Sequence, residues 1–204
     1  MKISIISGSH RNPSQSEKVA RYLEQTLNND FDDIEPWVYT LADNPLPLWD
    51  QTLWENSEEW QQRLAPIKQQ LIESDGFIII SPEWHGQVPA GLKNFFLLFN
   101  RFELGHKPAL IVTVSSGDGG AYPVAELRMS SYKNNRICYI PEHLVLRHIE
   151  KILNAKAEDN DIDADGYFRE RITWALGLLR GYAVALKVMR ESTAIHHDKF
   201  GNGM

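Results

Sequence analysis

The residues best suited to chemistry follow the first apolar run of the chain. Lys2 to Ser7 is a short β-branched run that opens into the loop 8–16, and a helical pattern begins near Glu17. In α/β proteins this arrangement binds phosphate, because the first N–H groups of a helix are unpaired and its dipole favours an anion. Three hydroxyls and one guanidinium add donors that suit a phosphate: Ser9, Ser14, Ser16 and Arg11.

The same loop has a second interpretation that involves no ligand. A serine just before a helix commonly caps it, so Ser14 or Ser16 would bond the first N–H groups of the helix and Arg11 would be solvated. These residues alone leave both interpretations open.

A second loop follows the continuous apolar run 76–80, which is typical of a strand buried on both faces. Pro82, Trp84 and Gly86 in this loop would form a shelf for a flat heterocycle, with backbone groups at its edge and an aromatic ring at its face. The alternative is a tight turn with Trp84 in the core.

A third loop, 115–120, is rich in glycine and follows the apolar run 108–114. Gly117 and Gly119 fall short of a dinucleotide fingerprint, because Tyr122 stands where a third glycine is required. The chain therefore contains neither a Rossmann NAD site nor a P-loop lysine.

Two of these loops resemble the signatures of the NADPH-dependent FMN reductase family, relatives of flavodoxin. The first reads Gly8-Ser9-x-Arg11-x-x-Ser14-x-Ser16, with Ser16 where the family has Asn. The second reads Ser81-Pro82-Glu83-Trp84-His85-Gly86 and leads through Pro89 to Leu92-Lys93-Asn94, similar to Ser-Pro-Glu-Tyr-Asn-Gly and Leu-Lys-Asn. It departs from the family pattern at five positions: Trp84, His85, Gln87, Ala90 and Gly91.

The resemblance implies an FMN-dependent oxidoreductase that transfers a hydride from NADPH or NADH through flavin N5 to a quinone, another flavin or a dye. Because the cofactor supplies this chemistry, we assign no catalytic acid or base. The phosphate would lie on Ser9, Arg11, Ser14 and Ser16. The ring would be framed by Pro82, Glu83, Trp84, His85, Gly86, Ser116, Gly117 and Gly119.

Two other functions stay open at this stage. One is an electron carrier like flavodoxin, although Arg11 counts against it because flavodoxin phosphate loops use hydroxyls and backbone groups. The other is a flavodoxin-like interaction module that has lost its cofactor, an option that the replacements at 84, 85, 90 and 91 keep open.

Strand patterns alternate with helical patterns along the chain, which predicts an α/β fold with a parallel sheet covered on both faces. Five strands fit the flavodoxin-like order 2-1-3-4-5, a three-layer sandwich with its ligand at the carboxyl ends of the strands. The loops 8–16, 81–90 and 115–121 would meet there. The expected strands are 2–7, 34–41, 76–80, 108–114 and 136–140, and the expected helices include 92–102 and 168–189, with a kink or a break at Pro66.

The composition fits one soluble domain over residues 1–192, followed by a flexible tail over 193–204. The chain has 204 residues, of which 43% are hydrophobic, and a net charge of -6 that argues against nucleic-acid and anionic membrane partners. No apolar run approaches the roughly 18 residues of a membrane span. Cys138 is the only cysteine, so we expect no internal disulfide and a cytoplasmic location.

Two sequence patterns that suggest metal binding are rejected. Asp161-x-Asp163-x-Asp165 copies the start of a calcium loop, but Ile172 stands where a bidentate glutamate is required. His196 and His197 lie in the tail, which would make a poor cage for a metal.

The helix expected at 92–102 is apolar on more than one side, which predicts burial against a second element. Its apolar residues are Leu92, Phe95, Phe96, Leu97, Leu98, Phe99 and Phe102. Together with the resemblance, this pattern predicts a homodimer or higher homo-oligomer with this helix at the contact. The alternative is that the C-terminal helix of the same chain covers the extra face.

Overall fold

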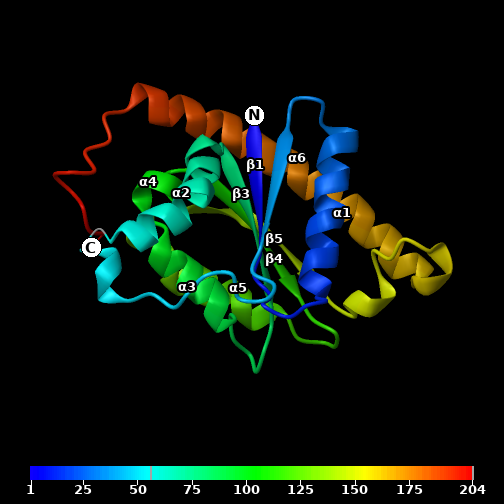
Figure 1. Cartoon of the computed structure of the whole chain (residues 1–204). Coiled ribbons are helices and arrows are strands. Elements are labelled where there is room, and N and C mark those ends of the chain that lie inside the picture. Colours follow the sequence, from blue (N-terminus) through cyan, green and yellow to red (C-terminus); the bar gives the residue numbers. More distant parts are fainter. Residues whose placement is uncertain (56, 204) are drawn as a thin grey trace.

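The protein is an α/β sandwich built on one parallel sheet, as a computed structural model that describes residues 1–55 and 57–203 shows (Figure 1). Its strands are β1 (Lys2–Ser7), β2 (Glu35–Thr40), β3 (Gly76–Pro82), β4 (Pro108–Val114) and β5 (Cys138–Leu146). All neighbouring pairs are parallel, and the order is β2-β1-β3-β4-β5. The predicted flavodoxin-like fold and strand order are confirmed.

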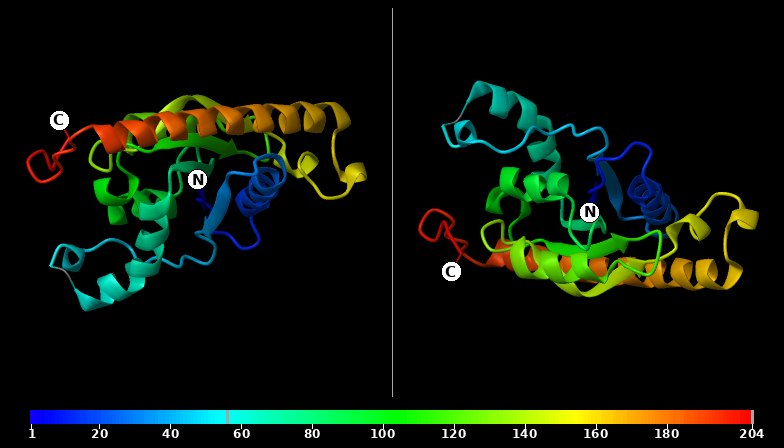
Figure 2. Two further views of the ribbon diagram at one scale, coloured as in Figure 1. Left: turned by 90° about the horizontal axis from the view of Figure 1, so that it is seen from above. Right: turned by 90° about the horizontal axis from the view of Figure 1, so that it is seen from below.

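Six α-helices cover the sheet in the part of the chain that the structure describes. They are α1 (Gln15–Asp30), α2 (Glu58–Glu73), α3 (Ala90–Leu98), α4 (Arg101–Leu104), α5 (Ala121–Ser130) and α6 (Ile162–Ser192). α1 and α6 pack on one face in a core that includes Ile5, Ile78 and Leu176. α2, α3 and α5 pack on the other face around Phe77 and Ile111. Figure 2 shows α6 as the outermost element along its side of the sheet.

The fifth strand differs from its prediction, because it begins at Cys138 and continues to Leu146 instead of covering 136–140. Pro141 lies inside it and suggested an end to the strand. β5 pairs only with β4, so it is an edge strand, and an edge strand tolerates a residue without an N–H donor. The register also shifts between Ala109 and Ile111, which marks an irregularity at this edge.

The single helix expected at 92–102 is wrong, because α3 ends at Leu98 and α4 begins at Arg101. Asn100 separates them through a capping box: its side chain accepts from the N–H of Phe102, and the Glu103 carboxylate accepts from the N–H of Asn100. The signature Asn-x-x-Glu is present in the sequence and is a known helix start.

The C-terminal helix is longer than expected and does not cover α3, since the two helices lie on opposite faces of the sheet. Leu97 and Phe102 are therefore left 63% and 52% exposed, whereas Leu98 is buried. By length and composition α6 is the one described helix that could cross a membrane, a test that core helices of soluble proteins also pass. α2 runs through Pro66 as one helix.

The tail after α6 contacts the body of the protein. Arg136 Nη2 donates to the carbonyl of Phe200, and the N–H of Gly203 donates to Asn134 Oδ1 over 3.1 Å. The rings of His197 and His106 stack at 6.0 Å. The flexibility of 193–204 and the division from the domain at residue 192 stay predictions.

A buried lysine joins two helices to the sheet. Lys107 Nζ donates to the carbonyls of Leu71, Ile72 and Glu103 over 2.7, 2.8 and 2.8 Å, so it pairs carbonyl groups at the end of α2 and in α4. Burial is the main cause that lowers the pKa of Lys107 to about 7; nearby Arg190 acts in the same direction, and Asp75 and Glu103 act in the opposite direction. Below this pKa the ammonium is held in an environment that disfavours its charge.

We expect Lys107→Met to destabilise the fold, because three buried carbonyls lose their donor. The unfolded chain binds an extra proton at this group between pH 7 and 10, so wild-type stability rises relative to the variant over that range, by about 1 kcal/mol per pH unit. Urea unfolding of both proteins at pH 7, 8.5 and 10 gives the difference between their free energies of unfolding at each pH. The contributions of all other titrating groups are the same in both proteins and cancel in this difference. A difference that stays constant with pH would contradict the assignment.

Candidate functional site

The first loop begins where no side chain fits. The N–H of Gly8 donates to the carbonyl of Ile80 over 2.8 Å, which extends the pairing of β1 with β3. A Cβ on Gly8 would lie 2.5 Å from that carbonyl oxygen and 2.6 Å from Leu92 Cδ2, so only glycine is accommodated. The loop therefore leaves the sheet at a fixed point between β3 and α3.

The hydroxyls of this loop have different roles. Ser14 is the N-cap of α1, and its Oγ accepts from the N–H of Glu17 over 3.1 Å, so capping is one of its functions. Ser9 Oγ accepts from the N–H of exposed Arg11 over 3.3 Å. Ser16 is 1% exposed, and no described residue pairs with its Oγ. A buried hydroxyl without a partner is costly, so the loop fits a ligand that supplies an oxygen here.

The second loop is a tight two-residue turn. Trp84 and Gln87 exchange backbone hydrogen bonds of 3.1 and 3.0 Å, and His85 and Gly86 between them have φ angles of 51° and 71°. Positive φ at both positions favours glycine, asparagine and, to a lesser degree, histidine. His85 therefore keeps the backbone turn that the Asn of the family pattern would form, and it presents an exposed imidazole.

Glu83 ties the second loop to the third. Its Oε2 accepts from the N–H of Gly120 over 2.7 Å and from that of Tyr122 over 3.2 Å, at the positive end of α5. A Cβ on Gly119 would lie 2.7 Å from Glu83 Oε1, so Gly119 is needed to let the carboxylate approach. The Glu83 side chain is thus a structural tie, a role that the sequence did not reveal.

The third loop is also held from β5. Arg147 Nε donates to the carbonyl of Gly119 over 2.9 Å, and His148 Nε2 lies 2.8 Å from Asp118 Oδ1. Within the loop, the N–H of Gly117 donates to Ser115 Oγ over 3.2 Å. These contacts fix the loop backbone beside the ends of β3 and β4.

The remainder of the second signature holds the surrounding loops in place. Lys93 Nζ lies 2.5 Å from Glu126 Oε1, and Glu126 Oε2 accepts from the N–H of Val88 over 2.7 Å. Buried Asn94 accepts from the N–H of Trp49 over 2.8 Å and donates to the carbonyl of Pro47 over 2.7 Å. Leu-Lys-Asn therefore positions the loops and is not itself part of the cleft described next.

The three loops enclose a cleft of about 280 Å³ at the carboxyl edge of the sheet. Its lining is Ser9, Arg11, Ser14, Gln15, Ser16, Pro82, Glu83, Trp84, Val114, Ser115, Ser116 and Gly117. The predicted site residues His85, Gly86 and Gly119 are not part of this lining. Gln15, Val114 and Ser115 also line the cleft, although they were not among the site residues predicted from the sequence. Trp84 packs edge to face with His10, with ring centroids 4.6 Å apart.

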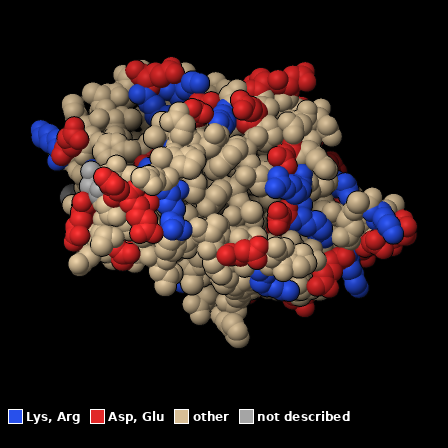
Figure 3. Space-filling model, in the orientation of Figure 1, with Lys and Arg blue, Asp and Glu red and all other residues tan. Residues whose placement is uncertain are grey.

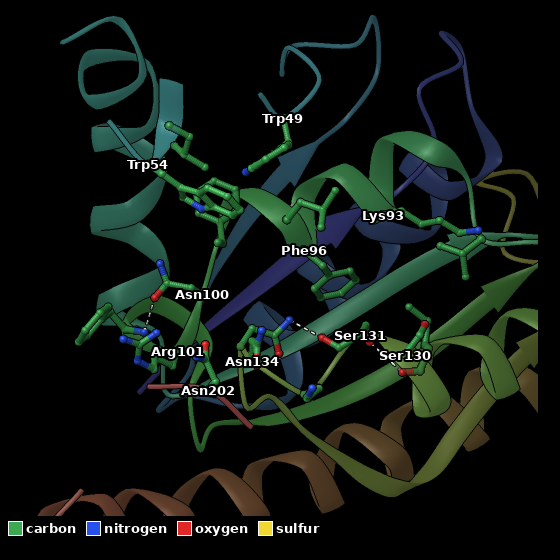
Figure 4. A pocket seen from close by; sticks show the side chains of 18 of the residues that line it. Trp49, Trp54, Lys93, Phe96, Asn100, Arg101, Ser130, Ser131, Asn134 and Asn202 are labelled. Atoms are coloured by element: carbon green, nitrogen blue, oxygen red, sulfur yellow. Dashed lines mark hydrogen bonds between the residues drawn. The ribbon is translucent and has the colours of Figure 1, made fainter. Parts of the chain in front are cut away.

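A second, larger cavity of about 1090 Å³ shares no lining residue with the cleft (Figure 4). It lies between α3, α5 and the loop that carries Trp49 and Trp54, whose rings meet at 4.7 Å. Phe96, Leu97 and Phe102 add to its apolar wall. It has no helix N-terminus with hydroxyl donors, so the phosphate-binding chemistry belongs to the smaller cleft.

The acidic pattern at 161–165 belongs to the start of α6. Asp161 is the N-cap, and its Oδ1 accepts from the N–H of Ala164 over 3.0 Å. Asp165 accepts from the N–H of Leu153 over 2.7 Å and from Arg169 Nε over 2.6 Å. Among residues 1–55 and 57–203, no three His, Cys, Asp or Glu side chains group as a metal site.

Comparison with known proteins assigns the chain to a family. The model of the NADPH-dependent FMN reductase family matches residues 1–151. Over 149 residues the chain is 29% identical to an NADPH azoreductase of Bacillus sp. (strain OY1-2), which covers 72% of this chain and 76% of that protein. Over 130 residues it is 30% identical to an FMN-dependent NADPH-azoreductase of Staphylococcus aureus (strain USA300), covering 63% and 68%.

A solved flavoenzyme, the NAD(P)H:(acceptor) oxidoreductase of Paracoccus denitrificans, shares the fold. Its TM-score is 0.66 at 18% identity, and the match covers 91% of this chain and 97% of that one. Because the family model matches well over half of the sequence, the chain belongs to the NADPH-dependent FMN reductase family. It is accordingly an oxidoreductase that uses FMN and NAD(P)H.

We expect Arg11→Ala to weaken FMN binding by ~1.5–3 kcal/mol, the value of a hydrogen bond to a charged group, and to leave the fold intact. Binding of riboflavin, which lacks the phosphate, should be nearly unchanged. Titrating both flavins by fluorescence quenching measures the two affinities.

The matched control is Glu83→Gln, which weakens the tie between the second and third loops and should therefore reduce the affinity for both flavins alike. Equal losses of FMN and riboflavin on Arg11→Ala would show that Arg11 does not contact the phosphate.

Proposed function

We propose that the protein is an FMN-dependent NAD(P)H oxidoreductase that passes a hydride to a small planar acceptor such as a quinone, a flavin or an azo compound. The observation that carries this proposal is the buried, unpartnered Ser16 hydroxyl in a cleft lined by all three predicted loops. The names of the azoreductase relatives support an azo compound as one acceptor.

In this proposal the N-terminal end of α1 holds the FMN phosphate. Ser16 Oγ donates to a phosphate oxygen and Arg11 supplies the opposite charge, with Ser9 and Ser14 as further hydroxyls. Pro82 and Trp84 frame the flavin ring on one side of the cleft, and Ser116 and Gly117 frame it on the other. When bound, FMN supplies the hydride chemistry at N5.

The protein contributes placement rather than proton transfer. Arg11 and Glu83 are the two charged side chains in the cleft lining, and the Glu83 carboxylate already accepts two backbone hydrogen bonds from α5. We therefore assign no catalytic acid or base. The nicotinamide of NADPH or NADH would bind over the flavin.

The test is an absorbance scan of the purified protein under anaerobic conditions. We expect a bound-flavin spectrum that bleaches on addition of NADPH or NADH and returns on addition of a quinone. Bound flavin that neither nucleotide bleaches would indicate an electron carrier. A colourless protein that fails to bind added FMN would indicate an interaction module.

We further propose that the enzyme is cytoplasmic and forms a homodimer through α3 and the large cavity beside it. Leu97, Phe102 and Trp54 leave apolar surface exposed around this cavity, at 63%, 52% and 78%. α6 lies on the other face of the sheet, so it does not cover this surface. Figure 3 shows acidic and basic side chains interspersed on this side, with no broad patch of one sign.

Leu97→Glu should separate this dimer, because it places a charge in an apolar contact. Leu98 is unsuitable for the same test, since it is buried in the core. Light scattering at micromolar concentration compares the mass of the variant with that of the wild type, and its melting temperature serves as the control for folding. An unchanged mass would place the contact elsewhere.

A further inference from the structure

The solvent-facing side of α6 lacks the polar character of an exposed helix face. Residues spaced three and four apart define this outer face: Gly166, Tyr167, Glu170, Trp174, Gly177, Leu178, Gly181, Val184, Ala185 and Val188. Glu170 is the one charged residue of this set, and Asp163 lies on the same side of the helix, three residues before Gly166. An exposed helix face is normally charged or polar, and the opposite face of α6 is already buried against the sheet.

Large apolar side chains stand free on this outer face. Trp174, Val184 and Val188 are 50%, 47% and 59% exposed. Figure 2 shows α6 along one side of the molecule. An apolar strip of this length marks a surface that is covered in the assembled protein.

Two glycines in the middle of the outer face have no role within the single chain. A Cβ on Gly177 or on Gly181 would meet nothing within 4 Å, and neither residue has a positive φ. Each weakens the helix relative to alanine. What glycine offers in return is a flat helix surface that another backbone can approach closely.

We propose that the outer face of α6 docks against the same face of a second copy of this chain, antiparallel, with the two-fold axis at Gly181. A two-fold contact requires a self-complementary surface. Leu178 and Val184 lie three residues on either side of Gly181, and Gly177 and Ala185 lie four on either side. Large and small residues are therefore arranged symmetrically about the axis.

This symmetry lets large side chains fit onto small ones. In the antiparallel pair, Val184 of one copy lies over Gly177 of the other, and Leu178 lies over Ala185. Trp174 and Val188, seven residues from the axis, close the two ends of the contact.

The charges beside the outer face favour a second copy over a lipid surface. The antiparallel arrangement sets Glu191 of one copy within about one turn of Arg169 of the other, on the same side of the contact. It also aligns the two helix dipoles favourably. An anionic membrane would instead meet Asp161, Asp163 and Glu170 near one end of α6, on a chain with a net charge of -6.

This surface is separate from the α3 contact, because α6 and α3 lie on opposite faces of the sheet. Two different two-fold contacts in one chain build an assembly larger than a dimer, which closes at four copies where the two axes meet at right angles. The α6 contact does not depend on the proposed dimer, so the two can be tested independently.

Light scattering at micromolar concentration tests the contact with three variants. Val184→Glu charges the centre of the outer face, Ile162→Glu is the matched control on an 84% exposed position of α6 away from that face, and Leu97→Glu opens the α3 contact. We expect a wild-type mass of more than two chains, two chains for Val184→Glu, two for Leu97→Glu and one for the double variant, with Ile162→Glu unchanged.

If Val184→Glu has the same mass as the wild type, the proposal is overturned, even if Leu97→Glu has a lower mass. If Val184→Glu has a lower mass and Leu97→Glu does not, the result supports the α6 contact and contradicts the α3 dimer. Gly181→Leu gives a second reading, since it blocks close approach and favours the helix, so it should lower the mass without lowering the melting temperature. Sedimentation of the wild type with phosphatidylglycerol vesicles, abolished by Val184→Glu with no change in mass, would assign the face to a membrane and refute the second copy.

Discussion

The structure depends on a parallel sheet whose central strands are buried on both faces. β1, β3 and β4 are mostly apolar and are buried along nearly their whole length, so they are stable only between two layers of helices. Parallel strands end at the same edge, and the loops after these three strands therefore meet there. The cleft is a consequence of this geometry, since residues more than 100 positions apart line it together.

The convergence of loops would not make a defined site without the Glu83 carboxylate. It accepts two N–H groups at the start of α5 and so fixes the third loop against the second. Close approach does the same for the first loop, because Gly8 packs against Ile80 and Leu92 with no room for a side chain. Most of the candidate site is thus preorganised by contacts between loops, and Ser16 is left as a buried hydroxyl with no partner among the described residues.

The two faces of the sheet leave different apolar surfaces exposed. On one side, α3 and the Trp49–Trp54 loop border a large cavity. On the other, α6 exposes a strip with glycines at its centre. A chain of this size buries one face of each helix in its own core, and these outer apolar surfaces are the basis of the two contacts that we propose.

The sequence by itself determined the fold class, the strand order, the cofactor class and most of the cleft lining. The fold class and the strand order follow from local signals, because buried strands are continuous apolar runs, whereas the cofactor class and the cleft residues follow from the resemblance of two loops to the signatures of the family. The break at Asn100 also had a local signature, Asn-x-x-Glu, which hydrophobic periodicity outweighed. Only the tertiary structure decided that Glu83 holds α5, that β5 tolerates Pro141 at the edge, and that Leu97 is exposed while Leu98 is buried. These depend on what lies opposite each side chain in space, and neighbours that are distant in sequence leave no local pattern.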